Sequence, residues 1–160
     1  MDDSNEKLSG LKTILHKAQA YCAYQERCTH EMAQKLREWK VDDDRIPSII
    51  EELTKEKFLN DLRFTQTFVS SKFRLNKWGK IKLAFELRMK KIPDALISQG
   101  LEVISEDEYR EAIQTLIAQK AREVKDTDAY ARKQKIARFL VSKGYETDLV
   151  FGELKSLGKD

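Results

Sequence analysis

One arrangement of apolar residues occurs three times along this chain, and this repetition limits its possible folds more than any other feature. Counted from an anchor leucine, positions −4, 0, +5, +10, +14 and +17 are apolar in every copy. The anchors Leu36, Leu87 and Leu140 lie 51 and 53 residues apart. The complete sets are Met32, Leu36, Val41, Ile46, Ile50 and Leu53; Leu83, Leu87, Ile92, Ile97, Leu101 and Ile104; and Ile136, Leu140, Tyr145, Val150, Leu154 and Leu157. Repetition at this period predicts a tandem array of modules, a shape suited to lying along an extended partner.

The composition indicates that the modules are helical. Of 160 residues only 6 are Gly and 2 are Pro, the residues on which loops and sheets depend most. We therefore predict an all-α protein, a tandem array of three three-helix repeats forming an elongated, curved molecule. The predicted segments are an N-terminal extension with the start of the first helix at 1–17, and repeats 1, 2 and 3 at 18–61, 62–104 and 105–160.

Each repeat is expected to begin with a long helix that precedes the anchor helix. These first helices are predicted at roughly Lys7 to Glu26, Leu62 to Leu75 and Glu106 to Lys125. Two of them have recognisable starts. Ser105 and Glu108 form a capping box, and Asp61 is a plausible cap for the middle helix.

The third helix of each repeat is expected to start near position +7, where Asp43, Asp94 and Thr147 are favoured N-cap residues. Pro47 must then lie in the first turn of its helix. At position +4, Gly144 can adopt the left-handed conformation that ends a helix, whereas the other copies have Lys40 and Lys91 there. The sequence predicts either different turns in those copies or the same turn with some strain.

The anchor helix of the middle repeat is apolar on two sides. Besides Leu83 and Leu87, it carries Ile81, Phe85 and Met89 on nearly the opposite face. Because a helix that is apolar on two sides is commonly buried on both, we predict that the central repeat is packed between its neighbours. The alternative is an exposed apolar stripe that contacts a partner helix.

Positive charge is concentrated in the middle repeat. Residues 62–92 carry 9 basic side chains and 1 acidic side chain, although the net charge of the chain is only +3. This indicates an anionic partner, with a lysine-rich solvated surface as the alternative. The basic residues flank Phe73 and Trp78, which suits phosphate contact with base stacking or an acidic protein groove, while a core role for Trp78 stays open. They are Lys72, Arg74, Lys77, Lys80, Lys82, Arg88, Lys90 and Lys91.

A second basic set lies in the third repeat but is diluted by Glu123, Asp126 and Asp128. We therefore predict a mixed, salt-bridged helix surface there. The set comprises Lys120, Arg122, Lys125, Arg132, Lys133, Lys135 and Arg138.

The sequence contains no recognisable catalytic constellation. With 2 His residues and no glycine-rich phosphate loop, it predicts no enzymatic activity and no cofactor. Cys22, Cys28 and His30 do not have zinc-ligand spacing, so we expect small buried thiols and no metal site. The absence of a disulfide framework indicates a reducing cytoplasm, residues 1–10 lack the profile of a secretory signal, and no apolar run is long enough to span a membrane.

Three segments of the chain resemble the motifs of one known family. The segment from Arg27 to Leu36, Arg-Cys-Thr-His-Glu-Met-Ala-Gln-Lys-Leu, is similar to the motif Arg-x-Ser-x-Glu-Leu-x-x-Lys-Leu. The segment from Phe58 to Phe64, followed by Phe68-Val69, resembles Leu-x-Asp-x-Arg-Phe-Ala and a Phe-Val pair. Gly79-Lys80-Ile81, Glu86-Leu87 and Lys90-Lys91-Ile92 resemble Gly-x-x-x-Ile, Glu-Leu and Lys-Gly-Ile. The departures are Thr29 for Ser, Met32 for Leu, Thr65 for Ala and Lys91 for Gly. In this order the motifs resemble those of the RecX family, regulators of the RecA recombinase.

The resemblance implies a non-enzymatic inhibitor that binds along the groove of RecA–DNA filaments and lowers ATP turnover, strand exchange and repressor self-cleavage. DNA is expected to be contacted weakly or through the filament, and the protein is expected to be a monomer. We interpret Asp61 and Arg63, the family's most recognisable pair, first as a cap and a helix-surface ion pair and second as interface residues. The candidate partner-binding residues are Lys72, Arg74, Lys77, Lys80, Lys82, Arg88, Lys90, Asp61 and Arg63.

A second hypothesis is a direct DNA-binding protein whose modules act as helix-turn-helix-like readers. It predicts tight binding to DNA without the recombinase and a steep dependence on salt. Against it, the basic residues are spread over a loop and helices instead of one recognition helix. Reversing the charges of Lys80, Lys82 and Lys90 together is expected to weaken inhibition if the middle repeat contacts the filament.

Overall fold

The computed structural model describes the backbone of residues 2–157 and the side chains of residues 10–157. Met1 and residues 158–160, which belong to the predicted first and last segments, lie outside this description. Within it, nine α-helices and no strands are present. The helices are α1 (Asp2–Tyr24), α2 (Thr29–Glu38), α3 (Ile46–Lys55), α4 (Asp61–Asn76), α5 (Lys80–Met89), α6 (Asp94–Leu101), α7 (Glu106–Glu123), α8 (Ala129–Ser142) and α9 (Thr147–Leu157).

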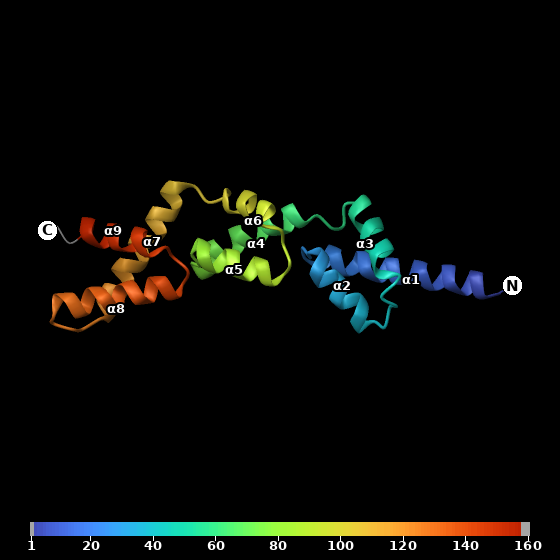
Figure 1. Cartoon of the computed structure of the whole chain (residues 1–160), viewed down its shortest axis with the longest axis horizontal. Coiled ribbons are helices and arrows are strands. Elements are labelled where there is room, and N and C mark those ends of the chain that lie inside the picture. The colour runs from blue at the N-terminus through green and yellow to red at the C-terminus, as the bar shows by residue number, and fades with distance from the viewer. Residues whose placement is uncertain (1, 158–160) are drawn as a thin grey trace.

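The helices form three consecutive triplets, α1–α3, α4–α6 and α7–α9, which follow one another along an elongated molecule (Figure 1). The N-terminus and the C-terminus lie at opposite ends of its long axis (Figure 1). The predicted all-α fold built from three-helix repeats is thereby confirmed. Among the described residues, no helix is both long enough and apolar enough to cross a bilayer.

The repeated apolar positions form the core. Fifteen of the eighteen side chains are buried, and all three anchor leucines are completely inaccessible. Ile50 and Leu101 are partly buried against the core, while Leu157, the last residue described, is largely exposed. The apolar periodicity therefore identifies the inward face of the helices in each triplet.

The buried side chains separate into two clusters instead of three. The first repeat has its own core, which includes Met32, Leu36 and Leu53. The second and third repeats share one continuous core, to which Leu87 and Leu140 both belong. Cys28, at the start of α2, is the residue of the first repeat that joins this shared core.

The turns after the three anchor helices have the same conformation. Lys40, Lys91 and Gly144 all have positive φ angles, of 64°, 60° and 99°. In every copy the backbone N–H at position +5 donates to the carbonyl oxygen of the anchor leucine, at 3.0, 3.1 and 3.2 Å. This bond is that of a Schellman C-cap, and it directs the apolar side chain at +5 into the core. Of the two predicted alternatives, the shared turn is correct, and two lysines adopt a conformation that glycine adopts more easily.

Several predicted helix starts are shifted. α3 begins at Ile46, and Asp43 instead pairs with Arg37 at 3.4 Å. Were Asp43 the cap, Pro47 would occupy the position whose N–H makes the first helical hydrogen bond, which proline cannot make. Asp94 and Thr147 are the first helical residues of α6 and α9 instead of their caps.

The starts of α4 and α7 differ in how well they were predicted. Asn60, not Asp61, caps α4, because its side chain accepts a hydrogen bond from the Arg63 N–H at 3.0 Å. Ser105 caps α7 as predicted, accepting from the Glu108 N–H at 3.1 Å. The Glu108 carboxylate lies 3.4 Å from the Ser105 hydroxyl and therefore reaches back to the side chain of the cap.

The prediction that α5 is buried on both faces is wrong. Leu83 and Leu87 are completely buried, but Ile81, Phe85 and Met89 are 56%, 57% and 61% exposed. The reason lies in how the repeats meet. The third repeat contacts the N-terminal end of α5 and does not pack along its side, so the second apolar face remains uncovered.

Candidate partner-binding surfaces and the repeat junctions

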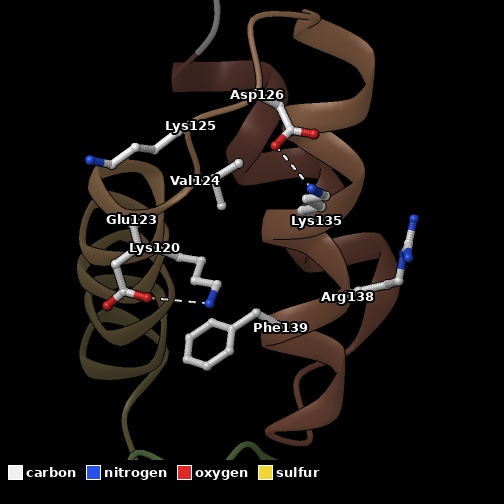
Figure 2. Close-up of a pocket in the computed structure, with 8 residues that line it drawn as sticks. All are labelled: Lys120, Glu123, Val124, Lys125, Asp126, Lys135, Arg138 and Phe139. Carbon is white, nitrogen blue, oxygen red and sulfur yellow. Dashed lines mark hydrogen bonds and ion pairs between the residues drawn. The ribbon is translucent and has the colours of Figure 1, made fainter.

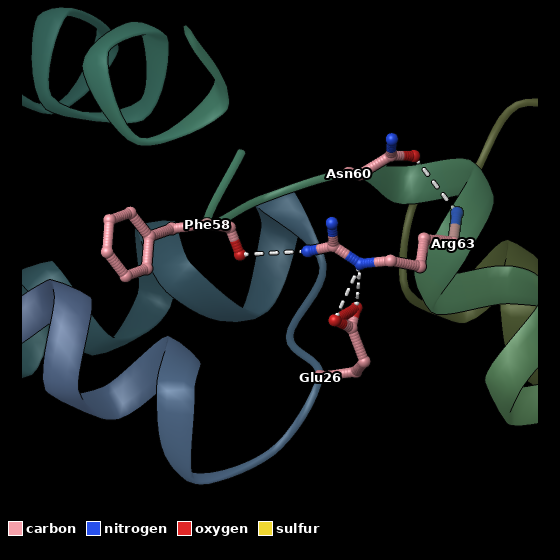
Figure 3. Close-up of polar contacts among 4 residues, drawn as sticks. All are labelled: Glu26, Phe58, Asn60 and Arg63. Atoms are coloured by element: carbon pink, nitrogen blue, oxygen red, sulfur yellow. Dashed lines mark hydrogen bonds and ion pairs between the residues drawn. The ribbon is translucent and has the colours of Figure 1, made fainter. Parts of the chain in front are cut away.

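Arg63 connects the first and second repeats (Figure 3). Its Nε donates to both carboxylate oxygens of Glu26, at 2.7 and 2.9 Å, and its Nη2 donates to the Phe58 carbonyl oxygen at 3.3 Å. Glu26 follows α1, so the bond joins segments 37 residues apart in sequence. Arg63 therefore does not pair with Asp61, and its main contacts are within the molecule.

Asp61 and Lys90 also connect the first and second repeats. One Asp61 carboxylate oxygen accepts from the backbone N–H of Thr29 at 2.8 Å and from its hydroxyl at 3.1 Å. Because Thr29 is the first residue of α2, the carboxylate satisfies an N–H that the helix itself leaves without a partner. Lys90 Nζ lies 3.0 Å from the carboxylate of Glu31, which belongs to α2 like Thr29. Three predicted partner-binding residues thus connect repeats 1 and 2.

Both cysteines are buried thiols, as predicted. Burial raises the pKa of Cys22, and it raises the pKa of Cys28 to about 11, with the carboxylates of Glu31 and Asp61 adding to the increase. A thiol is nucleophilic as the thiolate, so a raised pKa disfavours its reactive form. Their burial fits a packing role for both side chains, Cys22 within α1 and Cys28 at the start of α2.

The junction of the second and third repeats is a close approach of two backbone turns. The Gly79 N–H donates to the Lys143 carbonyl oxygen at 2.8 Å, and the Ile81 N–H donates to the Gly144 carbonyl oxygen at 2.9 Å. A Cβ atom on Gly79 would lie 2.3 Å from the Gly144 carbonyl carbon, so only glycine fits there.

Two tyrosines complete this junction. The Tyr109 hydroxyl accepts from the Lys80 N–H at 2.9 Å and donates to Glu146 at 2.5 Å, while the Tyr145 hydroxyl donates to the Lys77 carbonyl oxygen at 2.9 Å. Through the Tyr109 hydroxyl and the Lys143 and Gly144 carbonyl oxygens, the third repeat accepts hydrogen bonds from the backbone N–H groups at the start of α5. A helix has no partners of its own for these groups. Burial raises the pKa of both tyrosines.

Lys72 and Lys82 lie on either side of the half-buried Trp78. Their Nζ atoms are 5.3 and 4.6 Å from the centre of the indole ring, which also contacts Phe68 edge-on. Trp78 packs against the shared core, so it is an anchor with a cationic border and not a free stacking platform. The two amines form no ion pair with a carboxylate of the described chain, and they are therefore available to an anionic partner.

The two other candidate arginines, Arg74 and Arg88, also have acidic partners. Arg74 lies 3.3 Å from Glu108 of the third repeat, and Arg88 lies 3.0 Å from Asp94 in its own repeat. Both pairs are well exposed, so they contribute little stability and exchange easily with an external carboxylate or phosphate.

Four residues of the second basic set line a groove of about 540 Å³ between α7 and α8, namely Lys120, Lys125, Lys135 and Arg138 (Figure 2). Lys120 pairs with Glu123 at 3.2 Å and Lys135 pairs with Asp126 at 2.9 Å, which confirms the predicted salt-bridged surface. The Arg132 guanidinium donates to the carbonyl oxygens of Ala121 and Val124 and joins α8 to the end of α7.

The structure therefore divides the predicted site instead of assembling it. Asp61, Arg63 and Lys90 lie at the first junction, Lys77 and Lys80 at the second, and Lys72 and Lys82 around Trp78. The outward face of α5 corresponds to the exposed apolar stripe, the alternative to burial on both faces. The sequence signal for it is the presence of apolar residues on both sides of one helix.

Comparison with known proteins agrees with this architecture. Models of the first, second and third three-helix domains of RecX match residues 15–53, 60–101 and 106–152. The crystal structure of RecX from Lactobacillus salivarius superimposes with a TM-score of 0.86 at 23% identity, over 94% of this chain and 97% of that chain. A second crystal structure of a regulatory protein RecX has a TM-score of 0.79 at 20% identity. These likenesses to solved structures concern the fold.

Curated relatives bear the name regulatory protein RecX. The one from Prosthecochloris aestuarii is 29% identical over 150 residues, which are 93% of this chain and 96% of that protein. The one from Oceanobacillus iheyensis is 28% identical over 156 residues, or 94% of this chain, but the chain spans only 57% of that longer relative. With all three domain models matched in order along the repeats, the chain belongs to the RecX family of regulatory proteins.

Proposed function

We propose that this protein is a non-enzymatic modulator, mainly an inhibitor, of the RecA recombinase, which binds in the groove of RecA–DNA filaments. Bound there, it lowers ATP turnover, strand exchange and co-protease activity. The observation that carries the proposal is the linear arrangement of three modules (Figure 1). An elongated array contacts successive subunits of a filament at once, and the weak contacts add through effective concentration.

The basic middle repeat supports an anionic contact in this mode of binding. The ammonium groups of Lys72 and Lys82 form no ion pair with a carboxylate of the described chain. Both residues belong to the repeat that lies between the other two. The same pair supports the alternative, direct binding to DNA by the chain alone. Indole burial weakens this alternative, since base stacking needs an accessible ring face.

The test is the ATPase activity of RecA on single-stranded DNA, with the chain added below the RecA concentration. Binding of the chain to the same DNA without RecA is measured at two salt concentrations. We expect inhibition at concentrations that leave bare DNA largely unbound. If ATP turnover falls only when the chain has covered the DNA, direct DNA binding is the better description.

The structure favours a different set of lysines from Lys80, Lys82 and Lys90 for the charge-reversal test. Lys90→Glu would place two carboxylates together at Glu31 and disturb the first junction, so it does not isolate a partner contact. Lys72→Glu with Lys82→Glu is the cleaner pair, and it is expected to weaken inhibition about tenfold. Lys133→Glu with Lys155→Glu, on exposed faces of the third repeat, makes the same charge change and is expected to leave inhibition unaltered.

A further inference from the structure

The outward face of α5 carries three large apolar side chains that the fold does not cover. Ile81, Phe85 and Met89 recur at intervals of four residues, so they form one stripe along the helix. Each is more than half exposed, whereas Leu83 and Leu87 on the other side are inaccessible. The stripe therefore takes no part in the core of the protein.

The helix that bears the stripe contacts a neighbouring repeat at each end, and the contact is tighter at its N-terminus. At its N-terminus, the Lys80 and Ile81 N–H groups donate to Tyr109 and Gly144 of the third repeat. At its C-terminal end, Lys90 pairs with Glu31 of the first repeat. A surface positioned in this way loses little conformational freedom when it binds, which favours affinity.

Cationic side chains border the stripe on both sides. At 100° per residue, the direction of Arg88 around the helix axis falls just beyond one edge of the stripe, and that of Lys82 falls just beyond the other. The Arg88 ion pair with Asp94 is exposed and exchangeable. The complementary surface is consequently apolar along its centre and carries carboxylates at its rim.

This chemistry favours protein over nucleic acid as the occupant. Phosphates satisfy Arg88 and Lys82 but leave the aliphatic groups of Ile81 and Met89 in water, whereas an apolar protein surface removes them from it. We infer that the outward face of α5 is a docking site for a protein surface with apolar side chains bordered by carboxylates. This inference rests on the proposed function, and it places the complementary surface of the partner on the protomers of the recombinase.

The test replaces the stripe in the full chain by Ile81→Ser, Phe85→Ser and Met89→Ser together. The concentration for half-inhibition of RecA ATPase on single-stranded DNA is expected to rise about tenfold or more, because each tenfold change needs only about 1.4 kcal/mol. Affinity for the same DNA without RecA is expected to stay within about twofold of the parent value. A matched control, Leu75→Ser with Tyr130→Ser and Leu149→Ser, removes exposed apolar side chains elsewhere and should inhibit like the parent.

The outcomes separate the inference from the proposed function. If the parent inhibits RecA and the stripe variant inhibits equally well, the docking site is refuted and the function stands. If the parent neither binds nor inhibits the filament, both fail. A parallel loss of bare-DNA affinity, or a parent dimer in sedimentation that the variant abolishes, assigns the stripe to DNA or to self-association and overturns the inference.

A second measurement does not depend on how the triple variant folds. Phe85→benzoylphenylalanine places a photoreactive group in the middle of the stripe at an already exposed position. With RecA filaments on single-stranded DNA, we expect a cross-link to the RecA polypeptide. Cross-linking to DNA alone, or none in a chain that still binds the filament, contradicts the docking site.

Discussion

The two junctions between repeats are built from different interactions. The first consists mainly of charged side chains, with Glu26–Arg63 and Glu31–Lys90 as its ion pairs, and Cys28 is the buried side chain that crosses it. The second consists of backbone turns in contact at Gly79 and Gly144, with apolar side chains continuous on both sides.

This difference determines which repeats behave as one body. Opening the second junction exposes buried apolar surface, which costs about 25 cal/mol per Å². Opening the first mainly exchanges partly exposed ion pairs for water and exposes one small buried side chain, Cys28, which costs less. We therefore expect repeats 2 and 3 to unfold together and repeat 1 to separate from them more easily.

Gly79→Ala is expected to lower the free energy of unfolding most, by about 3 kcal/mol, because the new Cβ meets backbone atoms that have no room to move. Denaturant unfolding followed by circular dichroism measures the change. Gly152→Ala, on an open face of α9, is the control and is expected to be neutral or stabilising by up to about 1 kcal/mol. Equal unfolding midpoints for Gly79→Ala and the parent would refute the close backbone junction.

Asp61→Ala is expected to cost about 1.5 kcal/mol, because it removes the carboxylate that accepts two hydrogen bonds from Thr29. Hydrogen exchange should accelerate in α1–α3 and remain slow in α7–α9. Asp61→Asn keeps an acceptor oxygen and should recover part of the loss. Uniform acceleration over all nine helices would mean that the first junction is as tightly coupled as the second.

Stability is expected to fall as the pH rises above about 9 because of Cys28. The unfolded thiol ionises near its ordinary pKa of 9.0 and the folded thiol at about 11, so the unfolded chain binds fewer protons between these values. The stabilisation is complete below pH 9 and is lost as the pH approaches 11.

Cys28→Ala should therefore show a flatter decline than the parent between pH 9 and 10, in thermal unfolding at a series of pH values. The tyrosines at the second junction add a decline above pH 10 in both proteins, since their pKa values are also raised. Identical slopes below pH 10 would show that the Cys28 thiol is not protected by the junction.

The smallest effect concerns the left-handed turns. Lys91→Gly is expected to stabilise the protein by about 0.5–1 kcal/mol, since glycine adopts a positive φ without steric cost. Lys133→Gly, at an exposed position inside α8, is expected to destabilise it by about 1 kcal/mol. Differential scanning calorimetry of the two variants checks the opposite signs.

Much of the structure of each repeat could be predicted from residues that are close together in the sequence. The spacing of apolar residues identified the buried side chains, and Ser105 identified the start of α7, because such patterns depend on residues within a few turns of one another. The predicted start of α3 is wrong, and Pro47 excludes it because proline cannot donate the first helical hydrogen bond. The cap of α4 is Asn60, which directly precedes the predicted cap Asp61.

Short-range backbone geometry and the burial of apolar side chains specify the helical repeats, their inward faces and the shared turns, so these features follow from the order of the residues. The division into two cores, the roles of Asp61 and Arg63 at a junction, and the exposure of the second apolar face of α5 follow from the three-dimensional arrangement of the repeats. Each of these depends on how one repeat is placed against the next. That placement rests on contacts such as the one between Gly79 and Gly144, whose separation along the chain leaves no periodic signal.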